Sequence, residues 1–190
     1  MPELPEVETV RSRLAPDIER RTIVRARIDD PRLVRPELPA TIGAALVGLR
    51  IERVLRRGKY LLLRFSDGET MAVHLRMTGN VLRRVAGAEP PKALRAELEL
   101  DDGSLVAYTD LRRFGTWELF RDEASIDEFL AQRLGPEPFS EGFSPAFLYG
   151  AVHRRASPLK AVLLDQRVVA GLGNIYADES LWAAKIHPEL

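Results

Sequence analysis

Hydrophobic residues are spaced as in a helix at the start of the chain, alternate as in strands through its middle, and return to helical spacing towards its end. Apolar side chains three or four positions apart indicate the first helix: they are Leu4, Val7, Val10 and Leu14. We expect this short amphipathic helix to end near Pro16, because proline inside a helix removes a hydrogen bond.

The middle of the chain, from Thr22 to Phe120, has the composition of β-strands. Runs rich in β-branched and aromatic residues cover 22–28, 49–65, 70–77, 80–85, 95–110 and 114–120. Ser-Asp-Gly at 66–68 and Asp-Asp-Gly-Ser at 101–104 are turn signals that favour antiparallel hairpins. Six or more such strands predict a β-sandwich or a flattened barrel.

The last part of the chain has a helical pattern. A helical stretch at 124–134 follows the strands, and the segment GPEPFSEGF combines two prolines with two glycines, which is typical of a linker. Three further helices are expected at 144–155, 158–166 and 174–185. Ser157 and Asn174 are candidate caps of the last two. We therefore expect a β domain at 1–134, a linker at 135–143 and a helical domain at 144–190.

Charge and composition neither require nor exclude nucleic acid as a partner. The 190 residues carry 28 basic and 28 acidic side chains, so the net charge is zero. Only four of the basic residues are lysines, and an excess of arginine suits contacts with phosphates and base edges, although a GC-rich genome produces the same excess. The hydrophobic content of 45% is enough for a core.

Several classes of protein are disfavoured by what the sequence lacks. It has no cysteine, which excludes disulfides and thiolate metal sites within these residues, and its three histidines are scattered. We therefore expect no metal site. There is no signal-peptide pattern and no apolar stretch long enough to cross a bilayer, so we expect a soluble, intracellular protein.

The first residues could carry covalent chemistry. When the initiator methionine is removed, Pro2 has a free secondary amine, of which about a tenth is neutral at pH 7. Attack of this amine on an aldehyde-like carbon gives an iminium, which acts as an electron sink, and Glu3 could supply or accept the proton. Alternatively, Pro2 is an ordinary starting residue and the glutamates complement the dipole of the first helix.

Two stretches in the strand region could contact nucleic acid. RRGKYLLLRF at 56–65 places four cations around an apolar strand, which indicates either a phosphate-binding edge or a solvated sheet face. In HLRMTGN at 74–80, Met77 could act as a wedge between bases, whereas the alternative makes Met77 a core residue and His74 a structural histidine with satisfied hydrogen bonds.

Two later stretches have a similar character. In DLRRFG at 110–115, Arg112 and Phe114 could fill the hole that an extruded base leaves in a duplex, or they could pack on each other at the surface. The glycines of VVAGLGNIYADE lead into a helix at Asn174, whose backbone N–H groups could bind a phosphate, with Lys160 nearby in sequence.

Together these motifs resemble the formamidopyrimidine-DNA glycosylase family, bacterial enzymes that remove oxidised purines such as 8-oxoguanine. The resemblance rests on MPELPEVETV, RRGKYLLL, HLRMTG, TDLRRFG, LLDQ and GLGNIYADE, in the family's order and over essentially the whole chain. It implies an α+β fold with a short N-terminal helix, an antiparallel β-sandwich and a partial helix-two-turns-helix domain. It also implies a bifunctional DNA glycosylase and AP lyase of base excision repair, which cleaves the strand by β,δ-elimination.

The resemblance assigns roles to matching residues. Pro2 would attack C1′ of the damaged nucleotide, Glu3 would be the general acid and proton shuttle, and Lys59 would contact the phosphate. Met77, Arg112 and Phe114 would fill the void left by the extruded base, and Arg112 would also read the orphaned cytosine. The implied DNA-binding residues are His74, Met77, Arg112, Phe114, Lys160 and Asn174. Glu6 and Glu179 match acids near the active site.

The implied partner is double-stranded DNA with an oxidised purine or an abasic site, bound by a monomer in the bacterial cytoplasm at the nucleoid. The family continues beyond the position of Leu190 with the rest of the helical domain, a loop that closes on the flipped base and a four-cysteine zinc finger. We therefore expect no cofactor in this chain.

Three alternatives remain open from the sequence. One is a truncated homologue or fragment that binds damaged DNA with little or no catalysis. A second is an endonuclease VIII-like glycosylase for oxidised pyrimidines, which usually has a different opening string and lacks the RRFG residues. The third, a tautomerase that uses Pro2 as a base, is disfavoured by the six DNA-related motifs.

Overall fold

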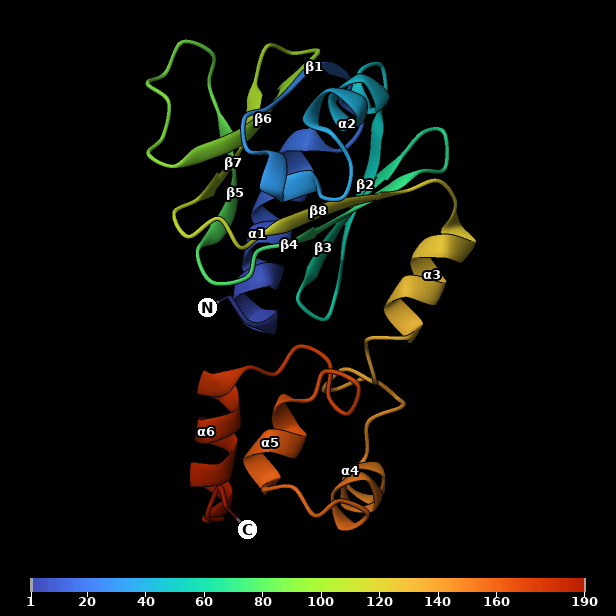
Figure 1. Cartoon of the computed structure of the whole chain (residues 1–190), viewed down its shortest axis with the longest axis vertical. Coiled ribbons are helices and arrows are strands. Elements are labelled where there is room, and N and C mark those ends of the chain that lie inside the picture. Colours follow the sequence, from blue (N-terminus) through green and yellow to red (C-terminus); the bar gives the residue numbers. More distant parts are fainter. Residues whose placement is uncertain (1, 190) are drawn as a thin grey trace.

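Two antiparallel sheets of four strands each dominate the computed structural model, which describes residues 2–189 (Figure 1). One sheet has the order β1-β6-β7-β5, with β1 Ile23–Ile28, β6 Leu94–Leu100, β7 Leu105–Asp110 and β5 Gly79–Arg84. The other has the order β2-β3-β4-β8, with β2 Ile51–Arg57, β3 Tyr60–Phe65, β4 Thr70–His74 and β8 Thr116–Phe120. The predicted antiparallel β-sandwich is confirmed, and the two turn signals lie in the β3–β4 and β6–β7 hairpins.

The N-terminal helix α1, Leu4–Ile18, packs against strands of both sheets, β5 on one side and β2 and β3 on the other. It buries Val7, Leu14 and Ile18 in the core between the sheets. The helix ends at Ile18, close to the predicted end near Pro16. Pro16 lies in the last turn, and the helix continues because Ile18 is completely buried in the core.

A second helix over the sandwich, α2 Pro39–Leu46, was missed by the hydrophobic pattern. It follows the 3-10 turn η1 Pro31–Val34 and lies against β1, with Ile42 and Leu46 buried. The eight residues are too few and too uniformly apolar to show a helical face. Pro39 in its first turn was the available signal.

Strand β3 is buried on both faces, which explains its continuous apolar run. Leu61 and Leu63 point into the core between the sheets. Tyr60 and Leu62 face the other way, into a smaller core covered by helix α3, Glu123–Ala131. A short apolar run without alternation is typical of a fully buried strand.

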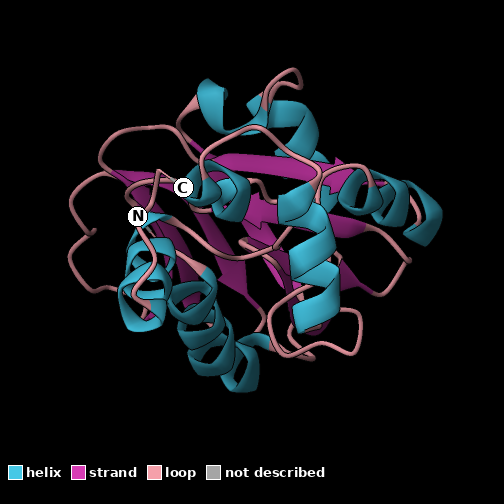
Figure 2. Ribbon diagram, turned by 90° about the horizontal axis from the view of Figure 1, so that it is seen from below, coloured by secondary structure: helices cyan, strands magenta, loops and turns pink. Residues whose placement is uncertain are grey.

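Three helices form the C-terminal part: α4 Pro145–His153, α5 Leu159–Leu164 and α6 Asn174–Ala184. They lie beyond one end of the sandwich in Figure 1, and in the view from below helices lie in front of the strands (Figure 2). Ser144 caps α4, since its hydroxyl accepts a hydrogen bond from the Phe147 N–H at 3.1 Å. The predicted cap Ser157 was wrong, because Pro158 is the N-cap of α5 and no side chain caps that helix.

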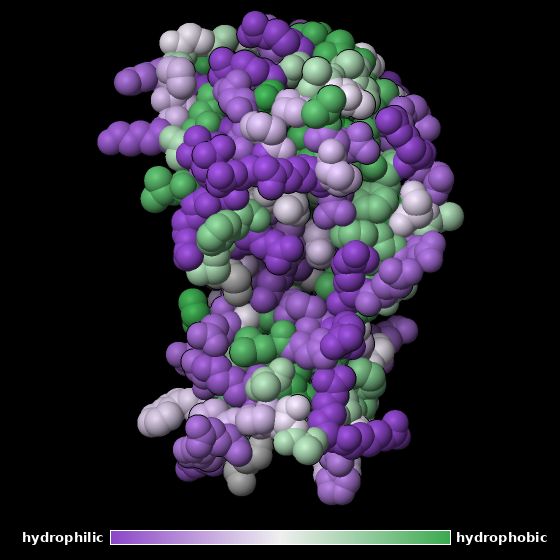
Figure 3. Space-filling view, viewed as in Figure 1, coloured by the Kyte–Doolittle hydropathy of each residue, from purple (hydrophilic) through white to green (hydrophobic). Residues whose placement is uncertain are grey.

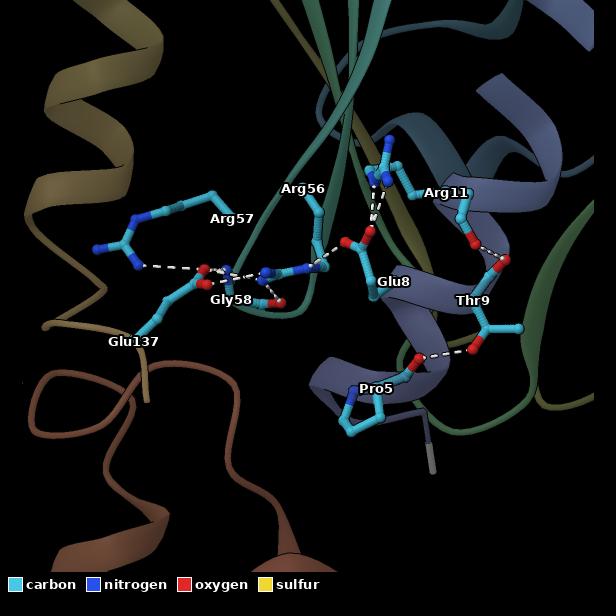
Figure 4. Close-up of polar contacts among 9 residues, drawn as sticks. Pro5, Glu8, Thr9, Arg11, Arg56, Arg57, Gly58 and Glu137 are labelled. Atoms are coloured by element: carbon cyan, nitrogen blue, oxygen red, sulfur yellow. Dashed lines mark hydrogen bonds and ion pairs between the residues drawn. The ribbon is translucent and has the colours of Figure 1, made fainter. Parts of the chain in front are cut away.

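Arg56 joins three segments where the sandwich meets the linker (Figure 4). Its guanidinium donates two hydrogen bonds of 2.8 Å to the Glu137 carboxylate and one of 2.9 Å to Glu8 of α1. The Gly58 N–H of the β2–β3 turn donates to the same Glu137 carboxylate at 2.5 Å. The Arg56 side chain is only 13% exposed. The hypothesis of a phosphate-binding edge on this strand is therefore wrong for Arg56, which is nearly buried and already bound to two carboxylates.

Glu137→Ala is expected to lower the free energy of unfolding by about 3–5 kcal/mol, because it leaves a nearly buried guanidinium without its main partner. Urea unfolding measures this loss. Glu123→Ala is the matched control, since the Glu123 carboxylate pairs with Arg64 at 2.8 Å but is 68% exposed. An exposed pair contributes about 0–1 kcal/mol. Equal losses in the two variants would contradict the structural role of Glu137.

Candidate active site

The Glu3 carboxylate lies where the N-terminus meets helix α6. It is 1% exposed and accepts hydrogen bonds from the backbone N–H groups of Gly173 at 2.7 Å, Ile175 at 2.9 Å and Tyr176 at 3.3 Å. Its own backbone N–H donates to Glu6 Oε2 at 2.9 Å. The Glu3 side chain therefore occupies the N-terminal end of α6, where the helix dipole and the free backbone N–H groups attract a carboxylate.

This arrangement corrects the predicted cap of α6. Gly173, not Asn174, is the N-cap residue, and Asn174 is the first residue of the helix. The free N–H groups at the helix start are taken by Glu3 from the other end of the chain. The hypothesis that these N–H groups bind a DNA phosphate is therefore wrong for Ile175 and Tyr176, which bind Glu3 instead.

The glycines before α6 allow the close approach of the N-terminus. A Cβ atom on Gly171 would lie 2.5 Å from Leu4 Cδ1, and one on Gly173 would lie 2.3 Å from Glu3 Cδ. Gln166 holds this loop, since its Oε1 accepts from the Gly171 N–H at 3.0 Å and its Nε2 donates to the Leu172 carbonyl at 2.7 Å. Gln166 is the last residue of the LLDQ motif and was not among the predicted site residues.

Lys59 occupies the β2–β3 turn and is 7% exposed. Burial lowers the pKa of its ammonium group, and the negative charge of Glu3 partly opposes this shift. Lys59 is therefore close enough to Glu3 for their charges to interact. Pro2 precedes Glu3 and is half-buried, whereas Met1 lies outside the described residues.

The two other acids implied by the resemblance have different surroundings. Glu6 stays close to Glu3, because its Oε2 accepts the Glu3 N–H and its Oε1 accepts the Tyr176 hydroxyl at 3.4 Å. Glu179 is exposed further along α6 and does not share these bonds. Of the two, Glu6 is the one that the structure places beside the candidate site.

The three predicted void-filling residues come from two neighbouring loops, one between β4 and β5 and one between β7 and β8. Met77 is 38% exposed and Phe114 is 53% exposed, so both large apolar side chains are accessible from solvent. The Arg112 guanidinium lies 4.9 Å from the centre of the Phe114 ring. The loops are joined by a hydrogen bond of 3.0 Å from the Arg112 N–H to the Thr78 hydroxyl. The three side chains can therefore act together.

His74 is neutral in the structure. Burial lowers its pKa to about 3, and the positive charges of Arg76 and Lys59 act in the same direction. Its Nδ1 accepts the Arg76 N–H at 3.0 Å, so the ring proton is on Nε2. Its ring meets Tyr60 edge to face, with centroids 4.7 Å apart. His74 can offer a neutral donor to DNA, but no positive charge.

The free energy of unfolding is expected to fall as the pH drops below 6.5, the ordinary pKa of histidine, since the unfolded chain then binds a proton that folded His74 accepts only near pH 3. At pH 5 the loss due to this residue is about 2 kcal/mol relative to pH 8. Urea unfolding of the original chain and of His74→Gln at both pH values measures it. The same pH dependence in both proteins would contradict the shifted pKa.

The predicted phosphate-binding residues of the helical part lie on neighbouring helices. The Lys160 ammonium group on α5 pairs with the Asp178 carboxylate on α6 at 2.8 Å. Asn174 is exposed at the start of α6. The negative charge of Asp178 beside Lys160 reduces the net gain from a contact between Lys160 and a phosphate.

On the face shown in Figure 3, the surface narrows between the sandwich and the helices, with hydrophilic side chains on both sides of the narrowing.

Within residues 2–189 no helix has the length and apolar character needed to span a membrane. The same residues contain no group of three or more His, Asp or Glu side chains placed to hold a metal ion. Since the chain also lacks cysteine, its residues do not fit a zinc finger.

Comparison with known proteins gives a consistent result. The sequence-family model of the formamidopyrimidine-DNA glycosylase N-terminal domain matches residues 1–117. The sequence-family model of the formamidopyrimidine-DNA glycosylase H2TH domain matches residues 134–190. The chain is 46% identical over 189 residues to formamidopyrimidine-DNA glycosylase of Chloroflexus aggregans, covering 99% of this chain and 68% of that protein. The protein of the same name from Heliobacterium modesticaldum is 48% identical to the chain, and the match covers 100% of this chain and 69% of that protein.

Solved structures agree with this. A complex between Lactococcus lactis Fpg and abasic-site DNA matches with a TM-score of 0.91 and 38% identity, over 98% of this chain and 68% of that one. A complex of inhibited Fpg with DNA that contains N7-benzyl-Fapy-dG matches with a TM-score of 0.93 and 38% identity. This match covers 100% of this chain and 70% of that one. The chain thus spans a little over two thirds of the length of these relatives.

Proposed function

Because the chain belongs to the formamidopyrimidine-DNA glycosylase family, whose members are DNA glycosylases of base excision repair, we propose that it excises oxidised purines, 8-oxoguanine and formamidopyrimidines, from double-stranded DNA and then cleaves the strand at the abasic site. The observation that carries the proposal is the buried Glu3 carboxylate, held by three N–H groups of α6 directly after Pro2 and near Lys59.

The proposed chemistry uses the Pro2 amine, which is free once Met1 has been removed. Its lone pair attacks C1′, the bond from C1′ to the base breaks, and the base leaves with a proton. Ring opening of the sugar gives an iminium between Pro2 and C1′. Loss of a C2′ proton then expels the 3′-phosphate, and a second elimination expels the 5′-phosphate. Glu3 moves protons at the sugar, and the cationic form of Lys59 contacts a phosphate.

The exposed loops support a role in base extrusion. Extruding a base costs a few kcal/mol of stacking and pairing, and an inserted wedge replaces the lost contacts. In the proposed complex, Met77, Arg112 and Phe114 fill the void, and Arg112 reads the cytosine. His74, Lys160 and Asn174 contact the backbone, so that DNA affinity decreases steeply with salt. We propose that the chain acts as a monomer in the bacterial cytoplasm.

Borohydride trapping tests the proposal, since the reductant converts the iminium into a stable amine that links protein to DNA. We expect a covalent product with a duplex that contains 8-oxoguanine opposite cytosine, and none with an undamaged duplex. Mass spectrometry first confirms that Met1 has been removed. No product with either 8-oxoguanine or an abasic site would contradict the catalytic role and favour a chain that only binds DNA.

The same assay separates the two glycosylase specificities. Duplexes with an oxidised pyrimidine, such as 5-hydroxycytosine, are compared at equal concentration and time. Faster trapping on the oxidised pyrimidine than on 8-oxoguanine would favour the endonuclease VIII-like alternative over the proposed purine specificity.

A further inference from the structure

Asp110, at the end of β7, is a buried carboxylate to which the proposed mechanism gives no role. It is 1% exposed. Its Oδ2 accepts the Phe114 N–H at 2.9 Å and the Gly115 N–H at 2.8 Å. Its Oδ1 accepts the Arg112 N–H at 3.1 Å and a short hydrogen bond from the Thr78 hydroxyl. One side chain therefore fixes the backbone of the loop that carries Arg112 and Phe114.

The Thr78 hydroxyl extends this network to the neighbouring loop. Thr78 directly follows Met77, and its oxygen both donates to Asp110 and accepts the Arg112 N–H at 3.0 Å. The Arg112 N–H is thus shared between two acceptors that come from different loops. As a result, the relative position of Met77, Arg112 and Phe114 depends on Asp110.

The second arginine of the motif is held away from the site. Arg113 has a φ of +60°, in the left-handed region, and its guanidinium makes two hydrogen bonds to Asp30, of 2.5 Å and 2.8 Å. The Asp30 side chain is 4% exposed. Arg113 is therefore anchored to the sandwich. Arg112 stacks over Phe114, and its guanidinium remains available to contact a base.

We propose that Asp110, acting through Thr78, is the positioning residue that holds Met77, Arg112 and Phe114 as one preformed wedge and so determines the preference for cytosine opposite the lesion. The inference rests on the proposed function. The carboxylate is suited to this role because it stays ionised: burial opposes ionisation, but the hydrogen bonds from Thr78 and the backbone outweigh it and lower the pKa of Asp110. An ionised acceptor makes the stronger hydrogen bonds.

The test measures binding without chemistry. The affinity for a fluorescent duplex that contains a tetrahydrofuran abasic analogue is determined by anisotropy, with cytosine or adenine opposite the analogue. We expect the original chain to prefer cytosine on the order of tenfold, the discrimination of one well-placed bidentate contact. Thr78→Val removes the hydroxyl at nearly constant volume, and we expect it to bring the ratio close to one, as Arg112→Ala does. Thr78→Ser retains the hydroxyl and should keep the preference.

Asp110→Asn should also abolish the preference, and Asp102→Asn is its matched control. Asp102 accepts the Ser104 N–H at 3.0 Å in the hairpin at the other end of β7. If Asp110→Asn does not fold, the Thr78 pair decides the question. Unchanged preference in Thr78→Val, while Arg112→Ala loses it, would overturn the proposal, as would a lack of preference in the original chain. Cytosine preference without borohydride trapping would contradict the proposed catalysis and leave the positioning role supported.

Discussion

A chain in which glycine replaces Pro2 is expected to lose borohydride trapping on 8-oxoguanine DNA by at least about a hundredfold. The pyrrolidine ring fixes the amine relative to the backbone that leads to Glu3, whereas glycine offers an unrestrained primary amine. A reacting atom misplaced by about 1 Å can cost on the order of a hundredfold in rate. The initial rate of covalent product under single-turnover conditions measures the effect, after mass spectrometry has confirmed the N-terminus.

A chain that retains Met1 is the matched control, because every other residue is the same. Its Pro2 nitrogen is part of a peptide bond, and its lone pair is delocalised into the carbonyl. We expect no covalent product from this form. Equal trapping with and without Met1 would move the nucleophile to another amine, and Lys59, whose pKa is lowered by burial, would be the first to examine by Lys59→Met.

The strands could be predicted from the sequence because their signals are local. Alternation, β-branched residues and the turns at 66–68 and 101–104 led to the correct antiparallel hairpins. Helix α2 could not be predicted in the same way, because its residues are mostly apolar and its burial depends on β1. The sequence shows composition along the chain, whereas the face that a short helix buries is decided by the tertiary structure.

The contacts that build the site were hidden for a similar reason. Glu3 binds Gly173 across 170 positions, and Arg56 binds Glu137 across 81 positions. No local pattern reports such a pairing. The acids near the N-terminus could be interpreted as a complement to the dipole of the first helix. This holds for Glu6 in the first turn of α1, whereas the Glu3 carboxylate binds the start of the last helix. The candidate residues came from the motifs and the family resemblance, and their grouping came from the fold.

Gly173→Ala is expected to lower the rate of base excision by about 10²- to 10⁴-fold, the usual contribution of general acid–base catalysis. The added Cβ would lie 2.3 Å from Cδ and 2.5 Å from Oε1 of Glu3. The φ of Gly173 is −125°, which alanine adopts readily, so steric overlap rather than backbone strain causes the effect. Because Glu3 is 1% exposed, its carboxylate has little room to move aside.

Gly150→Ala, on α4, is the control for Gly173→Ala. A Cβ there meets no atom within 4 Å, and alanine should stabilise the helix by up to about 1 kcal/mol without changing excision. Single-turnover excision of 8-oxoguanine and binding to the tetrahydrofuran duplex are measured for both variants. Asp110 at the end of β7 and Thr78 in the β4–β5 loop hold the wedge without a bond to Glu3, so Gly173→Ala should keep the cytosine preference while excision is lost. Loss of both would mean that displacing Glu3 disturbs the junction as a whole, and that Glu3 acts there by binding α6 rather than by moving protons.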